Sequence, residues 1–323
     1  MRRFKEQEQV EETIELLSHR ARCEVLAEVI TDKRSYPIYG IVIGPNDPTV
    51  PTVGLFGGVH GLEKIGSHVI FNYLRVLAEQ LQWDENLADS FNKCRLVSIP
   101  VVNPAGMFLN QRANPNGIDI MRNAPSSAEG KTTPFVSGHR LGPWLWWYRG
   151  QLGNEMEVET KTLVDFVTRE MFSAPFSLAL DIHSGFGMVD RLWYPYGKTR
   201  EDFPDINLAK HFINFMNKNM PYNVYQVEPQ SASYLIHGDV WDYLYDLHHQ
   251  NYKDKNNTFL PWTLEMGSWI WMRKNPKQIF SAHGIFNPII PHRYRRIMRR
   301  HRPLIEFIRL ATLNYRSWIS KAA

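Results

Sequence analysis

The sequence predicts an α/β fold built on a mainly parallel β-sheet. Short apolar runs, which are typical of buried strands, alternate along the chain with longer segments that carry apolar residues at helical spacing. Polar residues with catalytic or metal-binding chemistry lie at or near the ends of these runs: His60, Asn103, His183 and Glu265. Because sites in such sheets lie beyond the carboxyl ends of the strands, both observations favour the same fold.

The predicted strands are the short runs rich in Val, Ile, Leu and Phe. Residues 52–57 end in glycines just before His60, and residues 176–182 lead directly to His183. Residues 95–102 are stopped by Asn103-Pro104, because proline cannot continue a strand ladder. The other strand candidates are residues 39–43, 192–196, 223–227 and 259–266.

Helices are predicted where apolar residues recur every three or four positions. One covers about residues 64–81, and another covers residues 155–171 with acidic residues in its first turns, where they suit the helix dipole. Residues 103–150 between them are rich in Pro, Gly, Asn and Ser, and a loop this long is usually functional. Further helices are expected at residues 8–29, 205–219, 240–249 and 301–315.

Composition limits the class of protein. With 323 residues, the chain can form one large domain or two small ones, and its net charge of +4 is too mild to indicate a nucleic-acid or membrane partner. Two cysteines, Cys23 and Cys94, make no disulfide framework and suit a reducing compartment. The first residues lack the apolar core of a secretory signal, and no run approaches the roughly 20 apolar residues that span a bilayer. We therefore expect a cytoplasmic protein.

The most informative motif is His60-Gly61-Leu62-Glu63, between a predicted strand and a predicted helix. A His and a Glu three residues apart at such a junction can bind one metal ion, and His183 at the end of residues 176–182 would be the third ligand. Two His and one Glu with an open fourth position form a catalytic zinc set. Asp181 is either a second residue that orders His183 or a buried acid. Each histidine alone is as consistent with a hydrogen-bonded core residue.

These residues belong to a series of motifs that resembles the zinc carboxypeptidase family, the carboxypeptidase A-like metallopeptidases. The resemblance runs in order over about residues 50–270. After His60 and Glu63 it includes Asn103-Pro104-Ala105-Gly106, then Arg112, then the segment Gly117-Ile118-Asp119-Ile120-Met121-Arg122-Asn123, then His183, and finally Glu265.

The resemblance implies a fold and a set of roles. The fold would be a mixed, mainly parallel eight-stranded sheet between helices, in one domain over residues 1–323, with a helix at about 8–29 and a helical segment at about 292–318 as additions. One zinc ion per chain would be held by His60, Glu63 and His183. Glu265 would be the catalytic base, and Arg112 would stabilise the oxyanion.

The resemblance also implies residues that bind substrate. Arg122, with Asn123 beside it, would hold the terminal carboxylate of the substrate through its planar guanidinium. Tyr234 best matches a tyrosine that closes over the substrate, although Tyr243 and Tyr245 compete for that role. Asp239 lies near the expected side-chain pocket, and a helix N-cap for residues 240–249 is its alternative role.

The chain departs from the family pattern at Met121, where the family has an asparagine that helps hold the carboxylate.

Two further clusters have open roles. An aromatic run in the long loop either lines a cleft or anchors the loop to the body: Trp144, Trp146, Trp147 and Tyr148. An arginine cluster is expected to be a solvated helix face, because no nucleic-acid motif accompanies it: Arg293, Arg295, Arg296, Arg299, Arg300 and Arg302.

The predicted function is zinc-dependent hydrolysis of an amide bond, with release of a C-terminal residue from a peptide. One alternative is an amidohydrolase that acts on N-acyl amino acids or cell-wall peptides. Another is a non-catalytic binding protein on the same fold, which the joint presence of the three ligands and Glu265 argues against. The expected partner is a peptide or acyl-amino acid substrate, and the sequence does not give the oligomeric state.

Overall fold

A computed structural model describes residues 4–32, 34–252 and 257–319. Its centre is a single eight-stranded sheet in the order β1-β2-β4-β3-β5-β8-β6-β7. The strands are β1 (Ala21–Thr31), β2 (Arg34–Ile43), β3 (Thr52–Gly57), β4 (Arg95–Ile99), β5 (Phe176–Ser184), β6 (Arg191–Tyr194), β7 (Gln226–Pro229) and β8 (Thr258–Met266).

The sheet is mixed and mainly parallel, as predicted. Strands β4, β3, β5 and β8 run parallel to one another in its centre, whereas β1, β2 and β6 join through antiparallel pairings. Strands β3, β4, β5 and the greater part of β8 are buried throughout, which explains their continuous apolar sequence. Because the central strands are parallel, their carboxyl ends meet at one edge of the sheet, where His60, His183 and Glu265 lie.

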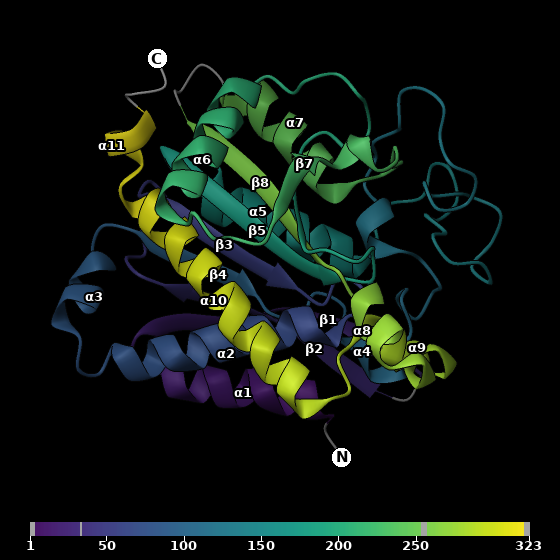
Figure 1. The fold of residues 1–323 in the computed structure, drawn as a ribbon, viewed down its shortest axis with the longest axis horizontal. Helices are drawn as coiled ribbons and strands as arrows, with labels where there is room; N and C mark the ends of the chain where they lie inside the picture. The colour runs from purple at the N-terminus through teal and green to yellow at the C-terminus, as the bar shows by residue number, and fades with distance from the viewer. Residues whose placement is uncertain (1–3, 33, 253–256, 320–323) are drawn as a thin grey trace.

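Helices cover both faces of this sheet (Figure 1). The helices are α1 (Lys5–Leu17), α2 (Lys64–Gln80), α3 (Glu85–Ser90), α4 (Pro104–Leu109), α5 (Val158–Met171), α6 (Ile206–Asn219), α7 (Val240–Tyr252), α8 (Trp269–Lys274), α9 (Ala282–Phe286), α10 (Pro291–Leu313) and α11 (Tyr315–Ile319). One apolar core joins α2, α6, α10 and α11 to the sheet, and a second joins α5 and α7 to its other face. Among the helices that the structure describes, none is long and apolar enough to cross a membrane.

The prediction of a helix over residues 8–29 is wrong in its second half. Helix α1 ends at Leu17, and residues Ala21–Thr31 form β1, which pairs antiparallel with β2. A bulge shifts the register between Val25 and Ala27, so the alternation of polar and apolar residues that marks an edge strand is broken there. Strand β2 correspondingly begins at Arg34, five residues before the predicted start at Tyr39.

The C-terminal helical segment lies close to its predicted bounds, as α10 and α11. Helix α10 begins ten residues before the predicted helix at residue 301 and continues through Pro303. Smaller shifts occur at β6 and β7, which were predicted at 192–196 and 223–227. The long segment 103–150 contains α4 and the 3-10 turn Ile120–Arg122, and is otherwise irregular.

Candidate active site

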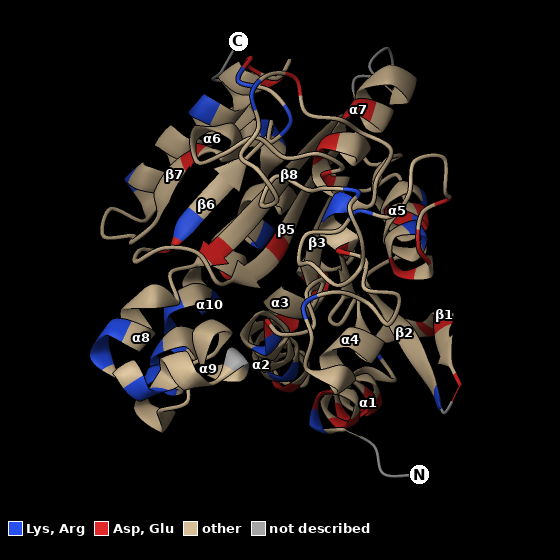
Figure 2. Cartoon of the chain, turned by 90° about the vertical axis from the view of Figure 1, so that its right-hand side faces the viewer, with Lys and Arg blue, Asp and Glu red and all other residues tan. Residues whose placement is uncertain are grey.

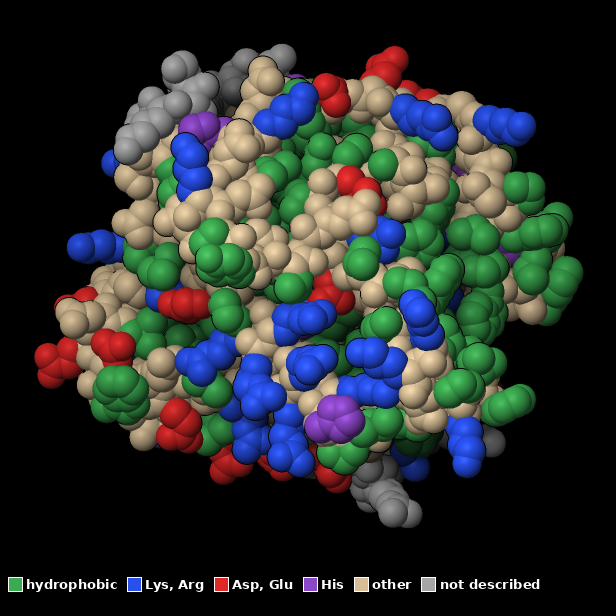
Figure 3. Space-filling model, in the orientation of Figure 1, with side chains coloured by type: hydrophobic (Ala, Val, Ile, Leu, Met, Phe, Trp, Pro, Cys, Tyr) green, Lys and Arg blue, Asp and Glu red, His purple; other side chains and the backbone are tan. Residues whose placement is uncertain are grey.

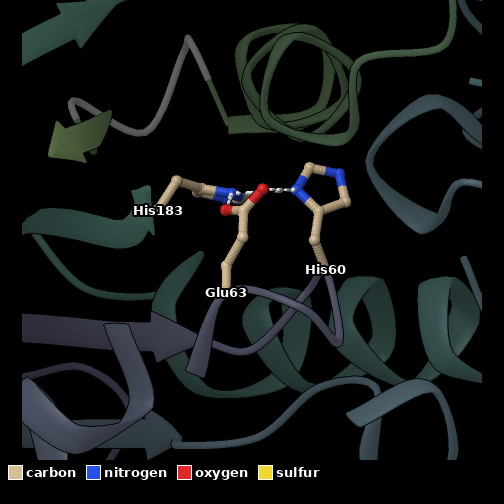
Figure 4. A group of neighbouring side chains, drawn as sticks. All are labelled: His60, Glu63 and His183. Carbon is tan, nitrogen blue, oxygen red and sulfur yellow. Dashed lines mark hydrogen bonds and ion pairs between the residues drawn. The ribbon is translucent and has the colours of Figure 1, made fainter. Parts of the chain in front are cut away.

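His60, Glu63 and His183 come together at the carboxyl edge of the sheet (Figure 4). His60 lies in the turn after β3, Glu63 immediately precedes α2, and His183 is the penultimate residue of β5. The Nδ1 atom of His60 is 2.9 Å from Oε1 of Glu63, and Nδ1 of His183 is 3.0 Å from Oε2 of Glu63. The two Nδ1 atoms are 3.2 Å apart, and all three side chains are buried.

This donor set fits a zinc ion. Tetrahedral ligands about 2.0–2.1 Å from zinc are separated by roughly 3.3 Å, close to the distance between the two Nδ1 atoms. The other ring nitrogen of each histidine faces a carboxylate: Nε2 of His60 is 3.0 Å from Asp119 and Nε2 of His183 is 2.7 Å from Asp181. At His183, a carboxylate that accepts the Nε2 proton leaves the Nδ1 lone pair free for the metal, whereas Nε2 of His60 also lies 2.8 Å from the donor Nη2 of Arg112. This is the one such group of ligands among the described residues.

The turn that carries His60 is held by the loop beneath it. The backbone N–H of Gly61 donates to the carbonyl of Arg112 at 3.2 Å, and a Cβ at Gly61 would meet the backbone of Gly106 at 2.2 Å. Asn103 caps the short helix α4 by accepting from the N–H of Gly106 at 2.8 Å. The Asn103-Pro104 motif therefore supports the metal-binding turn from below and needs glycine at both contact points.

Asp119 connects the metal site to both predicted arginines. Its Oδ1 faces His60, while its Oδ2 accepts from Nε of Arg112 at 3.0 Å and from Nη1 of Arg122 at 3.1 Å. Burial alone would raise the pKa of Asp119, but the charges of Arg112 and Arg122 hold that pKa well below its usual value. No role was predicted for Asp119 from the sequence, although it lies between Arg112 and Arg122, for which roles were predicted.

The second carboxylate partner, Asp181, is also fixed in place. The indole N–H of Trp241 donates to its Oδ2 at 2.8 Å, the same oxygen that faces His183. Asp181 is fully buried. Of its two predicted roles, the structure therefore gives it the one that orders His183.

Glu265 lies on β8 directly opposite His183 on β5. Its Oε1 accepts a hydrogen bond from the backbone N–H of Phe186 at 3.0 Å, and only 8% of the residue is exposed. Two effects raise the pKa of Glu265 to about 8: the larger is burial, and the second is the negative charge of Glu63. A carboxyl group with such a pKa can take up and return a proton near neutral pH.

A cavity of about 400 Å³ opens above these residues. The three metal ligands, Arg112, Arg122 and Glu265 all line it. Trp146 and Trp147 of the long loop and Trp269 of α8 also line the cavity, and the ring of Trp146 lies 6.1 Å from that of Phe286. Within the aromatic run of the long loop, these two tryptophans therefore line the cleft.

Arg122 points part of its guanidinium at the cavity. Its Nε donates to the carbonyl of Val136 at 3.1 Å and its Nη1 to Asp119, while Nη2 makes no hydrogen bond within the described part of the chain. Met121 lines the cavity beside it and supplies no polar group. Tyr234 also lines the cavity, with its ring 5.9 Å from that of Phe186. Tyr245, an alternative candidate for the tyrosine that closes over the substrate, is fully buried and donates to Asp205.

Two predicted substrate residues do not reach this cavity. Asp239 is 1% exposed and caps α7, where its Oδ1 accepts from the N–H groups of Trp241 at 2.9 Å and Asp242 at 3.0 Å. Asn123 accepts from the N–H of Glu157 at 2.6 Å and thereby ties the long loop to α5. Both side chains are occupied by backbone partners, so the structure gives them architectural roles.

Comparison with known proteins reveals the same family over most of the chain. The family model described as "Zinc carboxypeptidase" matches residues 21–272. Carboxypeptidase Z of Mus musculus is 23% identical over 205 residues, which cover 54% of this chain and 29% of that protein. The carboxypeptidase N catalytic chain of Homo sapiens is 25% identical over 180 residues, which cover 49% of this chain and 35% of that protein. The alignments thus span about a third of these relatives' length.

Solved structures share the fold. Thrombin activatable fibrinolysis inhibitor superposes with a TM-score of 0.67 at 16% identity, covering 94% of this chain and 72% of that one. Carboxypeptidase A from Helicoverpa armigera gives a TM-score of 0.57 at 17% identity, and the superposition covers 91% of this chain and 71% of that one.

Proposed function

Because the chain belongs to the zinc carboxypeptidase family, we propose that it hydrolyses the last peptide bond of a peptide and releases the C-terminal residue. The observation that carries this proposal is the orientation of Arg122. A nearly buried guanidinium with a free Nη2 lines a cavity that also contains the metal ligands and Glu265. A terminal carboxylate is the natural partner for that group.

The metal site supplies the electrophile. His60, Glu63 and His183 would hold the zinc ion, which when bound would acidify a water and polarise the carbonyl of the scissile bond. Glu265 takes the proton from the attacking water and transfers it to the leaving amine, a role that its raised pKa suits. The backbone N–H of Phe186 donates to one carboxyl oxygen of Glu265 and leaves the other for this proton.

The two arginines divide the negative charges of the substrate. Arg112 lies against Glu63 at 3.1 Å and Asp119 at 3.0 Å, so its charge sits next to the metal ligands, where an oxyanion would develop. Arg122 lies on the other side of Asp119 and binds the carboxylate. Met121 leaves that carboxylate with one hydrogen-bond donor fewer than an asparagine would give.

The expected substrate is a peptide. An acyl-amino acid also carries a terminal carboxylate that Arg122 could bind, so that substrate stays the second candidate. Aromatic side chains line the cavity, and two of them, Trp146 and Trp269, are 45% and 44% exposed, which suits contact with a peptide that enters from solvent.

We also propose that the protein is located in the cytoplasm. Its support is that Cys23 and Cys94 are both free thiols, and Cys94 is buried. Fractionation of cells that express the chain from its native gene would test it, and recovery outside the cytoplasm would overturn it.

The test of function uses matched peptides that differ only in a free or amidated C-terminus. We expect the wild type to cleave the free form far better, and Arg122→Ala to lose about 10- to 150-fold in kcat/KM, the value of a charged hydrogen bond. In that variant the free and amidated peptides should become nearly equal. Arg140→Ala is the control, because Arg140 is exposed on the same loop and lies outside the cavity. Equal cleavage of both peptides by the wild type would contradict the proposal.

A further inference from the structure

Positive charge is concentrated in one part of the chain. Residues 267–305 contain nine Lys and Arg residues and no Asp or Glu. The whole chain has 37 basic and 33 acidic residues, so the remainder has 28 against 33 and is net negative. Figure 3 shows Lys and Arg side chains gathered over α10, and Figure 2 shows them on α8 as well. The modest net charge of +4 conceals this separation.

A cavity of about 440 Å³ lies within the basic region, between α8, α10 and the segment before β6. Its basic wall is formed by Lys274 of α8 and by residues of α10 that include Arg293, Arg296 and Arg300. This cavity is separate from the catalytic one: Gly185 and Phe186 line the catalytic cavity, and residues 188–190 of the same segment line the basic cavity.

Most of this charge is not neutralised. One acid, Asp190, lines the cavity, and its carboxylate already binds Arg300 at 2.7 Å and the N–H of Gly267 at 3.0 Å. Arg293 donates only to neutral oxygens, including the carbonyl of Trp271 at 3.0 Å. Lys274 and Arg296 have no ion-pair partner among the residues that the structure describes. Three cations therefore share the cavity without a counter-charge.

Part of the cavity lining is apolar and accessible. Met188, Val189 and Val224 are 40%, 43% and 46% exposed and line the same cavity. Apolar side chains left in water beside unpaired cations suit a ligand with an anionic group and an apolar body. Two guanidinium groups and one ammonium match the several oxygens of a phosphate group better than the two oxygens of a single carboxylate.

We propose that this cavity is a binding site for the phosphate group of an amphiphilic anion. The phosphate would lie among Lys274, Arg293 and Arg296, and the apolar body would lie on Met188, Val189 and Val224. The source is either the headgroup of an anionic phospholipid at a membrane surface or a soluble phosphate ester. In the first case, binding would hold the catalytic cavity close to the membrane, because the two cavities flank the same segment, residues 185–190.

The test measures binding of two probes to the full chain. One probe is vesicles of phosphatidylcholine with or without phosphatidylglycerol, in a sedimentation assay, and the other is glycerol 3-phosphate, in calorimetry. The variant Lys274→Ala/Arg296→Ala removes two exposed cations from the cavity. The control Lys93→Ala/Lys218→Ala removes two exposed cations elsewhere, so the change in net charge is identical.

We expect at least one probe to bind the wild type and the cavity variant to bind it about 30-fold more weakly, since each cation near an anionic surface contributes about a factor of five. The control should bind like the wild type. Binding of vesicles that also weakens with Val224→Ser identifies a lipid, whereas binding of glycerol 3-phosphate identifies a soluble ester. Absence of binding to both probes, or equal loss in variant and control, would overturn the proposal. The readout is binding, so the result does not depend on peptidase activity.

Discussion

His183 and Glu265 face each other across the parallel pair β5–β8, in the same register position. The candidate metal ligand and the proposed base are therefore fixed relative to each other by a backbone ladder of nine residue pairs, not by loops. A ladder of this kind is among the stiffest parts of a fold, and it aligns both side chains at the carboxyl edge of the sheet.

Replacement of Glu265 by Gln should abolish turnover without loss of metal. The amide preserves the size of the side chain and can still accept from the N–H of Phe186, but it cannot carry the proton from the water. We expect kcat to fall by about 10²–10⁴ at unchanged zinc content, measured by peptide hydrolysis and metal analysis. Glu157→Gln, immediately before α5 and outside the cavity, is the control. Near-normal turnover in Glu265→Gln would exclude its role as base.

Replacement of His60 by Ala should remove the bound zinc. Wild-type protein should contain about one zinc per chain after dialysis, and the variant close to none, because two ligands do not hold the ion. His68→Ala is the matched control, since His68 lies on α2 nearby and pairs with Glu6 outside the ligand group. Full zinc content in His60→Ala would show that the ligand assignment is wrong.

Asn in place of Met121 should improve the binding of free C-termini. Met121 lines the cavity beside Arg122, and an amide there could donate a second hydrogen bond to the carboxylate. We expect KM for the free peptide to fall by about fivefold, the value of one net hydrogen bond of about 1 kcal/mol. The same measurement on the amidated peptide is the control, and an equal gain there would refute a carboxylate contact.

Glu159 should make the protein less stable as pH rises. Burial raises its pKa to about 7, its Oε2 accepts from Asn114 at 3.2 Å, and its Oε1 has no partner within the described residues. Above its ordinary pKa the unfolded chain releases the proton while the folded chain retains it, so the free energy of unfolding falls between about pH 4.5 and 7.

Glu159→Gln removes this titration. We therefore expect the variant to gain about 1–3 kcal/mol relative to the wild type on going from pH 4 to pH 8, measured by urea unfolding at equal zinc content. Glu155→Gln, which is exposed, should show no such change. A pH-independent difference between Glu159→Gln and the wild type would contradict the assignment.

The parts of the fold that the sequence predicted are those where burial is continuous. Residues 52–57, 176–182 and 259–266 are buried on both faces of the sheet, so their apolar content alone indicates a strand. The helix at 64–81 was equally clear because one of its faces is buried. Strand β1 was missed because it lies at the edge of the sheet and a bulge interrupts its alternation.

The site was predictable to the extent that it depends on residue type and order. His60, Glu63, His183 and Glu265 stand at the ends of strands, so the topology brings them together. The roles of Asn123 and Asp239 depend on which backbone N–H groups lie within hydrogen-bonding distance of each side chain in the folded protein. For Asp239 the sequence offered the helix N-cap as an alternative role, which the structure confirms, whereas the part played by Asp119 emerged only from its contacts.

Asp119 has a consequence for any attempt to change the specificity of the proposed peptidase activity. One carboxylate orients a metal ligand with one oxygen and balances two arginines with the other. Recognition of the substrate carboxylate and binding of the metal therefore cannot be changed independently. A redesign that exchanges Arg122 for a neutral residue, to accept substrates without a terminal carboxylate, would also alter the charge balance at Asp119, the carboxylate that faces His60. New specificity at this position would have to be selected together with a compensating change at the metal centre.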